Sequence, residues 1–235
     1  MDIVYILGTG SVWQDNEIRY SLRSVFKNVL DLGNIFVVGE FPGWLQGVSH
    51  IPCRDDFGAK WRNAYMKTRA ACENPNISEN FLLMNDDFFI LEPIKAAEYP
   101  YYYSTKILLK NSLKKARFKT TPHLTAARLP VKRKNFLNFA VHRPVRINKK
   151  MYLEMPEPEL KMLGFSPRAY YCNYYNLPGV GYRERNLQPR CREKDIEKMT
   201  KGQTDISMFS MTARSPVFQN WIKRKFPNPS AYEKV

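Results

Sequence analysis

The chain has 235 residues, of which 44% are hydrophobic and 14% aromatic, and this composition excludes disorder and allows one large domain with a substantial core. No apolar run approaches the length of a membrane span, and the first residues lack the basic and apolar parts of a signal peptide. We therefore expect a cytoplasmic protein with no transmembrane segment, whose 4 cysteines are reduced thiols and do not form a zinc site.

The net charge of +15 is unevenly distributed. Residues 1–95 contain 9 basic and 12 acidic residues, whereas residues 96–155 contain 14 basic and 2 acidic residues. Such a concentrated positive field attracts polyanions or anionic membranes. Basic residues interleaved with aromatic ones suit a nucleic-acid groove, although a solvated charged loop is the alternative. The candidate nucleic-acid-binding residues are Lys114, Lys115, Arg117, Lys119, Lys132, Arg133 and Lys134.

The first elements predict a buried strand followed by a helix. Residues 2–7 are mostly apolar, and Gly8-Thr9-Gly10-Ser11 follows as a small turn. Such a turn lets the backbone approach a phosphate or nucleotide, although a plain strand-to-helix turn is the alternative. Residues 15–30 show apolar residues at helical spacing, with Asp15 or Asn16 as the expected cap.

Two arginines on this helix are candidate ligands of a nucleotide. Arg19 and Arg23 are four residues apart, so they lie on one side of the helix. They form either a solvated basic face or a pair that reaches a diphosphate. Gly33-Asn34 is expected to end the helix, before a second strand at residues 35–39.

The stretch from Phe81 to Leu91 is the most informative in the chain. Apolar residues on both sides of Asn85-Asp86-Asp87 predict a buried strand that ends at Met84, followed by an acidic turn. Buried carboxylates need a cation, a metal or water, and open α/β sheets bind ligands at this carboxyl edge. The turn suits Mg²⁺ or Mn²⁺ held by Asp86 and Asp87 with substrate phosphates. A plain acidic β-turn is the alternative.

The order of these elements predicts the fold class. Residues 1–91 favour the order β-α-β-(β)-α-β, which is typical of an α/β fold with a mostly parallel sheet flanked by helices. The rest of the chain is basic, aromatic and loop-rich. Tyrosines at residues 170–175 indicate either an acceptor surface or core packing. His142 is expected at a strand end, where it is structural or acts as a base or phosphate contact, and Asp205 lies near the start of another element.

Three blocks carry a resemblance to a known family: residues 16–25, residues 42–45 and residues 81–91. In this order they resemble the Stealth family, sugar-phosphate transferases of polysaccharide synthesis related to the lysosomal-enzyme N-acetylglucosamine-phosphotransferase. His142-Arg143-Pro144 looks like the later histidine block of that family. The resemblance implies a glycosyltransferase-A-like fold that binds a nucleotide sugar. Residues 6–11 replace the family's Trp-Val-Asp-Gly turn, so both sugar-phosphate transfer and ordinary sugar transfer stay open.

These observations together predict a metal-assisted glycosyltransferase that uses a nucleotide sugar as donor. Residues 1–95 would form the nucleotide-sugar-binding half of one domain, and residues 96–235 its basic acceptor-binding half. Mg²⁺ or Mn²⁺ on Asp86 and Asp87 would neutralise charge on the leaving nucleotide. The candidate nucleotide-binding residues are Gly8, Thr9, Gly10, Ser11, Arg19 and Arg23. The candidate catalytic residues are His142, Asp87 and Asp205.

The acceptor is predicted from charge. The basic middle segment favours a polyanion, and DNA carrying modified bases is the first expectation, with groove access or base flipping to reach the base. The alternative is a Stealth-like sugar-phosphate transferase in capsule or surface-glycan synthesis. A non-catalytic nucleic-acid-binding protein is the second alternative. The sequence indicates no oligomeric state.

Overall fold

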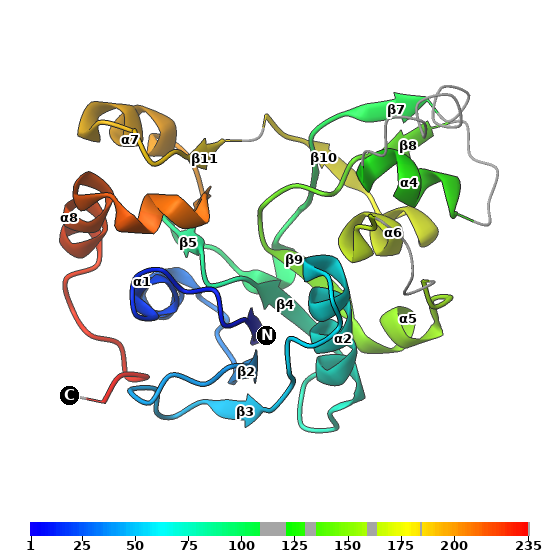
Figure 1. Ribbon diagram of the computed structural model, residues 1–235, viewed down its shortest axis with the longest axis horizontal. Coiled ribbons are helices and arrows are strands. Elements are labelled where there is room, and N and C mark those ends of the chain that lie inside the picture. The colour runs from blue at the N-terminus through cyan, green and yellow to red at the C-terminus, as the bar shows by residue number, and fades with distance from the viewer. Residues whose placement is uncertain (109–120, 130–134, 159–163, 184, 235) are drawn as a thin grey trace.

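The computed structural model describes residues 1–108, 121–129, 135–158, 164–183 and 185–234 (Figure 1). A five-stranded sheet lies at its centre, with strand order β3-β2-β1-β4-β9. The first four of these strands in chain order run parallel, and β9 is antiparallel to β4. The predicted mostly parallel sheet is therefore confirmed. The strands are β1 (Asp2–Leu7), β2 (Ile35–Gly39), β3 (Ser49–Ile51), β4 (Asn80–Met84) and β9 (Val145–Asn148).

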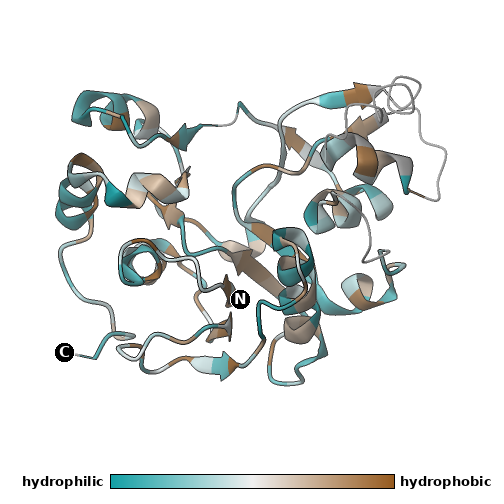
Figure 2. Cartoon of the chain, in the orientation of Figure 1, coloured by the Kyte–Doolittle hydropathy of each residue, from teal (hydrophilic) through white to brown (hydrophobic). Residues whose placement is uncertain are grey.

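Two helices cover opposite faces of this sheet: α1 (Asn16–Asn28) and α2 (Lys60–Glu73) (Figure 1). Side chains alternate across a strand, so Ile3 and Tyr5 of β1 pack in the same core cluster as α1, whereas Val4 packs in the cluster that includes α2. Figure 2 shows hydrophobic residues concentrated in the central strands. The α/β order predicted for residues 1–91 is confirmed, including the strand end at Met84.

A smaller sheet of order β11-β12-β5 extends the fold on the side of α1. β5 follows the acidic turn, and β12 pairs with it antiparallel, which brings chain segments more than a hundred residues apart into register. A third apolar cluster joins this sheet to the helices that follow it. The elements are β5 (Phe88–Ile90), β11 (Asn186–Leu187), α7 (Glu193–Thr200), β12 (Asp205–Met208), η3 (Ser210–Arg214) and α8 (Pro216–Lys225).

The remaining described elements form a lobe next to α2 (Figure 1). Two short strand pairs, β6 with β10 and β7 with β8, lie there with three helices. Tyr170 and Tyr171 are 5% and 0% exposed, so these two tyrosines belong to the core and not to an acceptor surface. The elements of the lobe are β6 (Tyr101–Tyr103), β7 (Lys106–Leu108), α4 (Thr121–Ala127), β8 (Asn135–Leu137), α5 (Lys149–Glu154), α6 (Pro167–Tyr174) and β10 (Gly179–Gly181). The short η1 (Ala96–Glu98) packs instead against β4, in the same core cluster as α1.

Both halves of the chain contribute to the central sheet, because β9 is its edge strand. The functional division at residue 95 stays a prediction. The 4 cysteines are free thiols, as expected. None of the helices in the described ranges combines the length and apolar character of a membrane span.

The start of α1 differs from the expectation. Asp15 stands at the cap position, but its backbone is left-handed with φ of 59° and its side chain makes no capping hydrogen bond. Glu17 instead accepts hydrogen bonds from the Val12 amide at 3.0 Å and the Ser11 hydroxyl at 2.8 Å. A carboxylate in the first turn thus ties the preceding loop to the positive end of the helix. The helix ends at Asn28, before Gly33.

Candidate functional site

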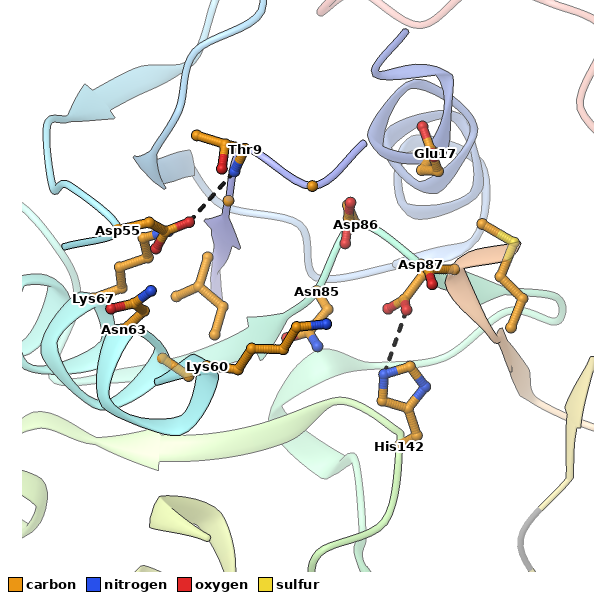
Figure 3. A pocket seen from close by; sticks show the side chains of 16 residues that line it. Thr9, Glu17, Asp55, Lys60, Asn63, Lys67, Asn85, Asp86, Asp87 and His142 are labelled. Carbon is orange, nitrogen blue, oxygen red and sulfur yellow. Dashed lines mark hydrogen bonds and ion pairs between the residues drawn. The ribbon is translucent and has the colours of Figure 1, made fainter. Parts of the chain in front are cut away.

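A pocket of about 500 Å³ opens at the carboxyl ends of β1 and β4 (Figure 3). The two strands are parallel neighbours, with Tyr5 opposite Met84, so the turns that follow them lie at the same edge of the sheet. The turn from Gly8 to Gly10 lines one side, and the turn from Asn85 to Asp87 lines the other. The pocket also takes polar side chains from Glu17, Asp55, Lys60, Asn63, Lys67 and His142.

The two adjacent carboxylates lie in surroundings that disfavour their negative charge. Burial raises the pKa of Asp86 to about 6, with a further contribution from the negative charge of Glu17. Burial and the charge of Asp86 raise the pKa of Asp87 well above its ordinary value. The Oδ1 atom of Asp87 is buried and makes no hydrogen bond within the described ranges. An unpaired buried carboxylate oxygen beside two more carboxylates fits the binding of a cation here.

The donor atoms present suit one kind of metal ion. Nowhere in the described part of the chain do three or more His, Cys, Asp or Glu side chains gather as a complete metal cage. Mg²⁺ needs no such cage, because it keeps several waters and binds through one or two carboxylates plus substrate phosphates. Asp86 and Asp87 therefore fit an ion that is completed by substrate, and metal binding by these two residues stays a proposal.

His142 lies across the pocket from the Gly8 turn (Figure 3). Its Nε2 atom is 3.4 Å from Oδ2 of Asp87, and its ring meets the Phe88 ring edge-on at 4.9 Å. Burial and the nearby positive charge of Arg168 lower its pKa to about 4, so the ring is neutral at neutral pH. The expectation of a strand end was wrong, because His142 lies in the loop before β9. The structure places His142 beside the acidic turn, and its predicted role as a base or phosphate contact stays a prediction.

Sequence reasoning missed a buried ion pair beneath the Gly8 turn. Lys67 is 3% exposed, and its Nζ donates to the Leu7 carbonyl at 2.6 Å and lies 2.5 Å from Oδ1 of Asp55. Oδ2 of Asp55 accepts a hydrogen bond from the Thr9 amide at 3.3 Å. A Cβ at Gly8 would lie 2.6 Å from Oδ2 of Asp55, so glycine is required for this contact.

The only signal of Lys67 in the sequence is its position on α2. It falls four residues before the buried Ala71, on the face that packs against the sheet. A lysine on an apolar face of a helix is a candidate for a specific buried partner. Its partner Asp55 lies in the loop before the helix, and no spacing rule connects the two positions.

The structure does not bring Arg19 and Arg23 to the pocket. Arg23 binds Glu233 through Nε at 2.8 Å and Nη2 at 2.7 Å. Arg19 stacks on the Trp44 ring at 4.3 Å, with Nε 3.7 Å from Glu233. Both arginines therefore attach the C-terminal segment to α1. The Ser11 hydroxyl faces Glu17 and lines a second cavity that adjoins the Gly8 turn.

Asp205 also lies away from the pocket lining. It is 1% exposed, and its carboxylate is bound by Arg143 and by the Tyr99 hydroxyl at 2.6 Å. The Arg143 guanidinium lies over the rings of Tyr102 and Tyr182, at 4.0 and 4.1 Å from their centroids. This closed network satisfies the carboxylate and leaves none of it facing the pocket. The location of Asp205 favours a structural role, in which its ion pair with Arg143 fixes the loop that carries His142.

The structure does not test the predicted nucleic-acid-binding residues. Lys114, Lys115, Arg117, Lys119, Lys132, Arg133 and Lys134 all lie outside the described residues.

Comparison with known proteins agrees with the geometry of the site, because the similar proteins are named as transferases. The chain is 26% identical over 202 residues to a capsular polysaccharide phosphotransferase of Actinobacillus suis, in an alignment that covers 74% of this chain and 55% of the relative. It is 30% identical over 127 residues to the capsular polysaccharide phosphotransferase fcs1 of Haemophilus influenzae, with 48% of this chain and 35% of the relative covered. The predicted Stealth resemblance is confirmed. The chain spans about half the length of the first of these relatives, and no family model matches it.

A solved structure supports the fold. The galactosyltransferase LgtC, crystallised with donor and acceptor sugar analogues, aligns over 100% of this chain and 98% of its own, with a TM-score of 0.55 and 8% identity. Identity this low shows the fold alone. The predicted glycosyltransferase-A-like α/β fold is therefore confirmed.

Proposed function

We propose that this chain carries the nucleotide-sugar site of a Stealth-like transferase of capsule or surface-glycan synthesis. The observation that carries the proposal is the pair of adjacent carboxylates, Asp86 and Asp87, which face the Gly8 turn across one pocket. Burial raises the pKa of both, and Oδ1 of Asp87 makes no hydrogen bond within the described ranges. Carboxylates at that edge suit a metal-bound diphosphate. The relatives, which are named capsular polysaccharide phosphotransferases, support a glycan as acceptor.

The donor would lie between the two turns. The backbone from Gly8 to Gly10 offers a close approach to phosphate, and Lys60 supplies a positive charge at the exposed side of the pocket. Asp86 and Asp87 would hold Mg²⁺ or Mn²⁺, which when bound neutralises the charge that develops on the leaving nucleotide. Lys67 is already paired with Asp55, so its role is to position the turn.

Two reactions fit this arrangement. In sugar-phosphate transfer, the acceptor hydroxyl oxygen bonds to the β-phosphorus, the bond from that phosphorus to the bridging oxygen breaks, and a nucleoside monophosphate leaves. In sugar transfer, the new bond forms at the anomeric carbon and a nucleoside diphosphate leaves. In both, the hydroxyl proton needs a base, and the neutral ring of His142 beside Asp87 is the candidate. The names of the relatives favour the first reaction.

Two other predicted functions have less support. Transfer to DNA and nucleic-acid binding without catalysis both depend on basic residues outside the described ranges. A binding protein also offers no reason for two adjacent carboxylates whose pKa values burial raises in a pocket. The acceptor proposed here is accordingly a glycan, and nucleic acid stays a prediction from charge.

A panel of nucleotide sugars tests the proposal. Thermal unfolding is measured with UDP-, GDP- and CMP-sugars in Mn²⁺, in Mg²⁺ and in EDTA, because a ligand that binds only the folded state raises the melting temperature. We expect a metal-dependent rise with one donor, lost in Asp86→Asn and Asp87→Asn. Asp56→Asn is the matched control, since Asp56 is exposed and does not line the pocket.

The released nucleotide then separates the two reactions. With a UDP- or GDP-sugar, release of a nucleoside monophosphate indicates sugar-phosphate transfer, and release of a nucleoside diphosphate indicates sugar transfer. A CMP-sugar has a single phosphate, so it allows only sugar transfer, with release of CMP. If no donor raises the melting temperature in either metal, the transferase proposal fails.

A further inference from the structure

Three exposed apolar side chains lie close together in the chain. Phe209, Met211 and Val217 are 45%, 48% and 37% exposed. Among the described residues, 7 large hydrophobic side chains are exposed to this extent, and 3 of them fall within these nine positions. Single exposed apolar residues are ordinary, but a cluster marks an interaction site. We call these three residues the 209–217 patch.

The patch begins at the rim of the pocket. Met208 and Ser210 line the pocket, whereas the residues that alternate with them, Phe209 and Met211, are exposed to solvent. Arg214, at the end of η3, lines the second cavity together with Gly8 and Thr9. Whatever the patch contacts would therefore lie next to the mouth of the proposed transferase site.

The patch is held firmly in place. The Phe209 amide donates to the Leu187 carbonyl at 3.0 Å, and the buried Thr212 hydroxyl donates to the same carbonyl at 2.7 Å. Val217 is in the first turn of α8, which packs against η3. The apolar side chains are thus presented by hydrogen-bonded backbone, and their exposure is a property of the fold.

Positive charge surrounds the patch. Residues 182–192, which include β11, and residues 209–225, which include η3 and α8, contain 8 basic residues and 1 acidic residue. Two of the eight, Arg192 and Arg224, form ion pairs with Asp195 and Glu193 of α7. β11 contacts η3 through Leu187, and α8 contacts η3. Arg183, Arg190 and Arg214 are exposed and make no ion pair with any described residue. The apolar residues therefore lie in a basic surround.

We propose that the 209–217 patch is a docking face for an anionic lipid bilayer. Apolar side chains that enter the boundary between headgroups and acyl chains, with basic residues around them on anionic headgroups, are the combination that holds proteins at a membrane surface. A nucleic acid would match the arginines but leave Met211 and Val217 without a partner. An apolar protein surface would match the patch but leave the arginines without one.

Docking in this way would face the pocket mouth toward the membrane. An acceptor carried at the membrane surface would then reach the site without leaving the bilayer. That consequence rests on the proposed function, whereas the docking itself does not.

Vesicle sedimentation without any donor or acceptor tests the proposal. The full chain is mixed with vesicles of phosphatidylcholine alone, or of phosphatidylcholine with phosphatidylglycerol, at low and high salt. We expect binding to the anionic vesicles only, weakened by salt. The double variant Phe209→Ser, Met211→Ser should bind about tenfold more weakly, because two half-exposed apolar side chains are lost from the interface.

Two further variants keep the test specific. Leu30→Ser is the matched control, because Leu30 is 67% exposed and lies just after α1, outside the 209–217 patch, and it should bind as the wild type does. Arg183→Gln with Arg190→Gln should reduce both the affinity and its salt dependence. If the serine variant has a lower melting temperature than the wild type, its weaker binding can result from unfolding, and the arginine double variant then decides the test.

Three results would overturn the proposal. The first is equal binding to neutral and anionic vesicles, the second is full binding by both the serine and the arginine variants, and the third is no binding at all. Self-association that the serine variant abolishes would assign the patch to a second copy of the chain. Because no nucleotide sugar is present, none of these results depends on the transferase proposal.

Discussion

The link between Arg23 and Glu233 gives a prediction that separates two roles for the same arginine. Glu233 is 5% exposed and accepts four hydrogen bonds, two from Arg23 and two from the amide and hydroxyl of Ser230. Glu233→Gln removes the charge and keeps the shape. If the structure is right, this change near the C-terminus weakens the attachment of the last residues to α1.

The expected size of the effect follows from burial. Removing one partner of a fully buried ion pair costs about 3–5 kcal/mol. The Arg23 side chain is 12% exposed and retains the carbonyls of Phe226 and Pro227 as acceptors, so we expect a smaller loss of about 2–3 kcal/mol. A double-mutant cycle with Arg23→Met should give a coupling energy of about 2 kcal/mol.

Urea unfolding measures these free energies, with Glu92→Gln as the control because Glu92 is exposed and makes no ion pair within the described ranges. Burial alone would raise the pKa of Glu233, but the hydrogen bonds from Arg23 and Ser230 lower it below its ordinary value. A depressed carboxylate pKa stabilises the fold above the unfolded-state pKa, and the stabilisation is lost as the pH falls through the folded-state pKa. The difference between wild type and Glu233→Gln should therefore be largest at neutral pH and shrink in acid.

A coupling energy below about 0.5 kcal/mol, the value typical of exposed ion pairs, would refute this reasoning. The reasoning would also be refuted if Arg23→Met kept the stability of the wild type but lost donor binding. That outcome would indicate that Arg23 binds the diphosphate of the donor.

Three further variants test the core and the site. Lys67→Met should lower the free energy of unfolding by about 3 kcal/mol, because Asp55 loses its buried cation, and should also weaken donor binding in the thermal-shift assay. Phe81 is 0% exposed in β4, so Phe81→Ala should lower the free energy of unfolding in urea by about 3–5 kcal/mol. A decrease below about 1 kcal/mol would contradict the packing of that strand. Asp86→Asn in EDTA should instead be more stable than wild type by about 2 kcal/mol at neutral pH, because the raised pKa of Asp86, about 6, makes its ionised form unfavourable in the folded state. This gain should disappear below pH about 4, where Asp86 is protonated in both the folded and the unfolded state. A gain that is the same at both pH values would argue against the charge as its cause.

The sequence by itself determined the central strands and the acidic turn. Continuous apolar runs specify buried parallel strands, and two carboxylates directly after such a run have to lie at the strand end. That is why the strand end at Met84, and the acidic turn directly after it, followed from local pattern alone. The sequence singled out His142 as a candidate site residue, but neither its contact with Asp87 nor the loop that carries it was predicted.

Only the tertiary structure decided which charged side chains face the pocket. Arg23 and Glu233 are 210 positions apart, and Asp205 meets its arginine 62 positions away. Local periodicity fixes the face of a helix or strand on which a side chain lies, but not the segment that packs there. The partner of an arginine on α1 or a lysine on α2 is set by how distant segments close around the sheet, because long-range packing and not local spacing brings opposite charges out of water together.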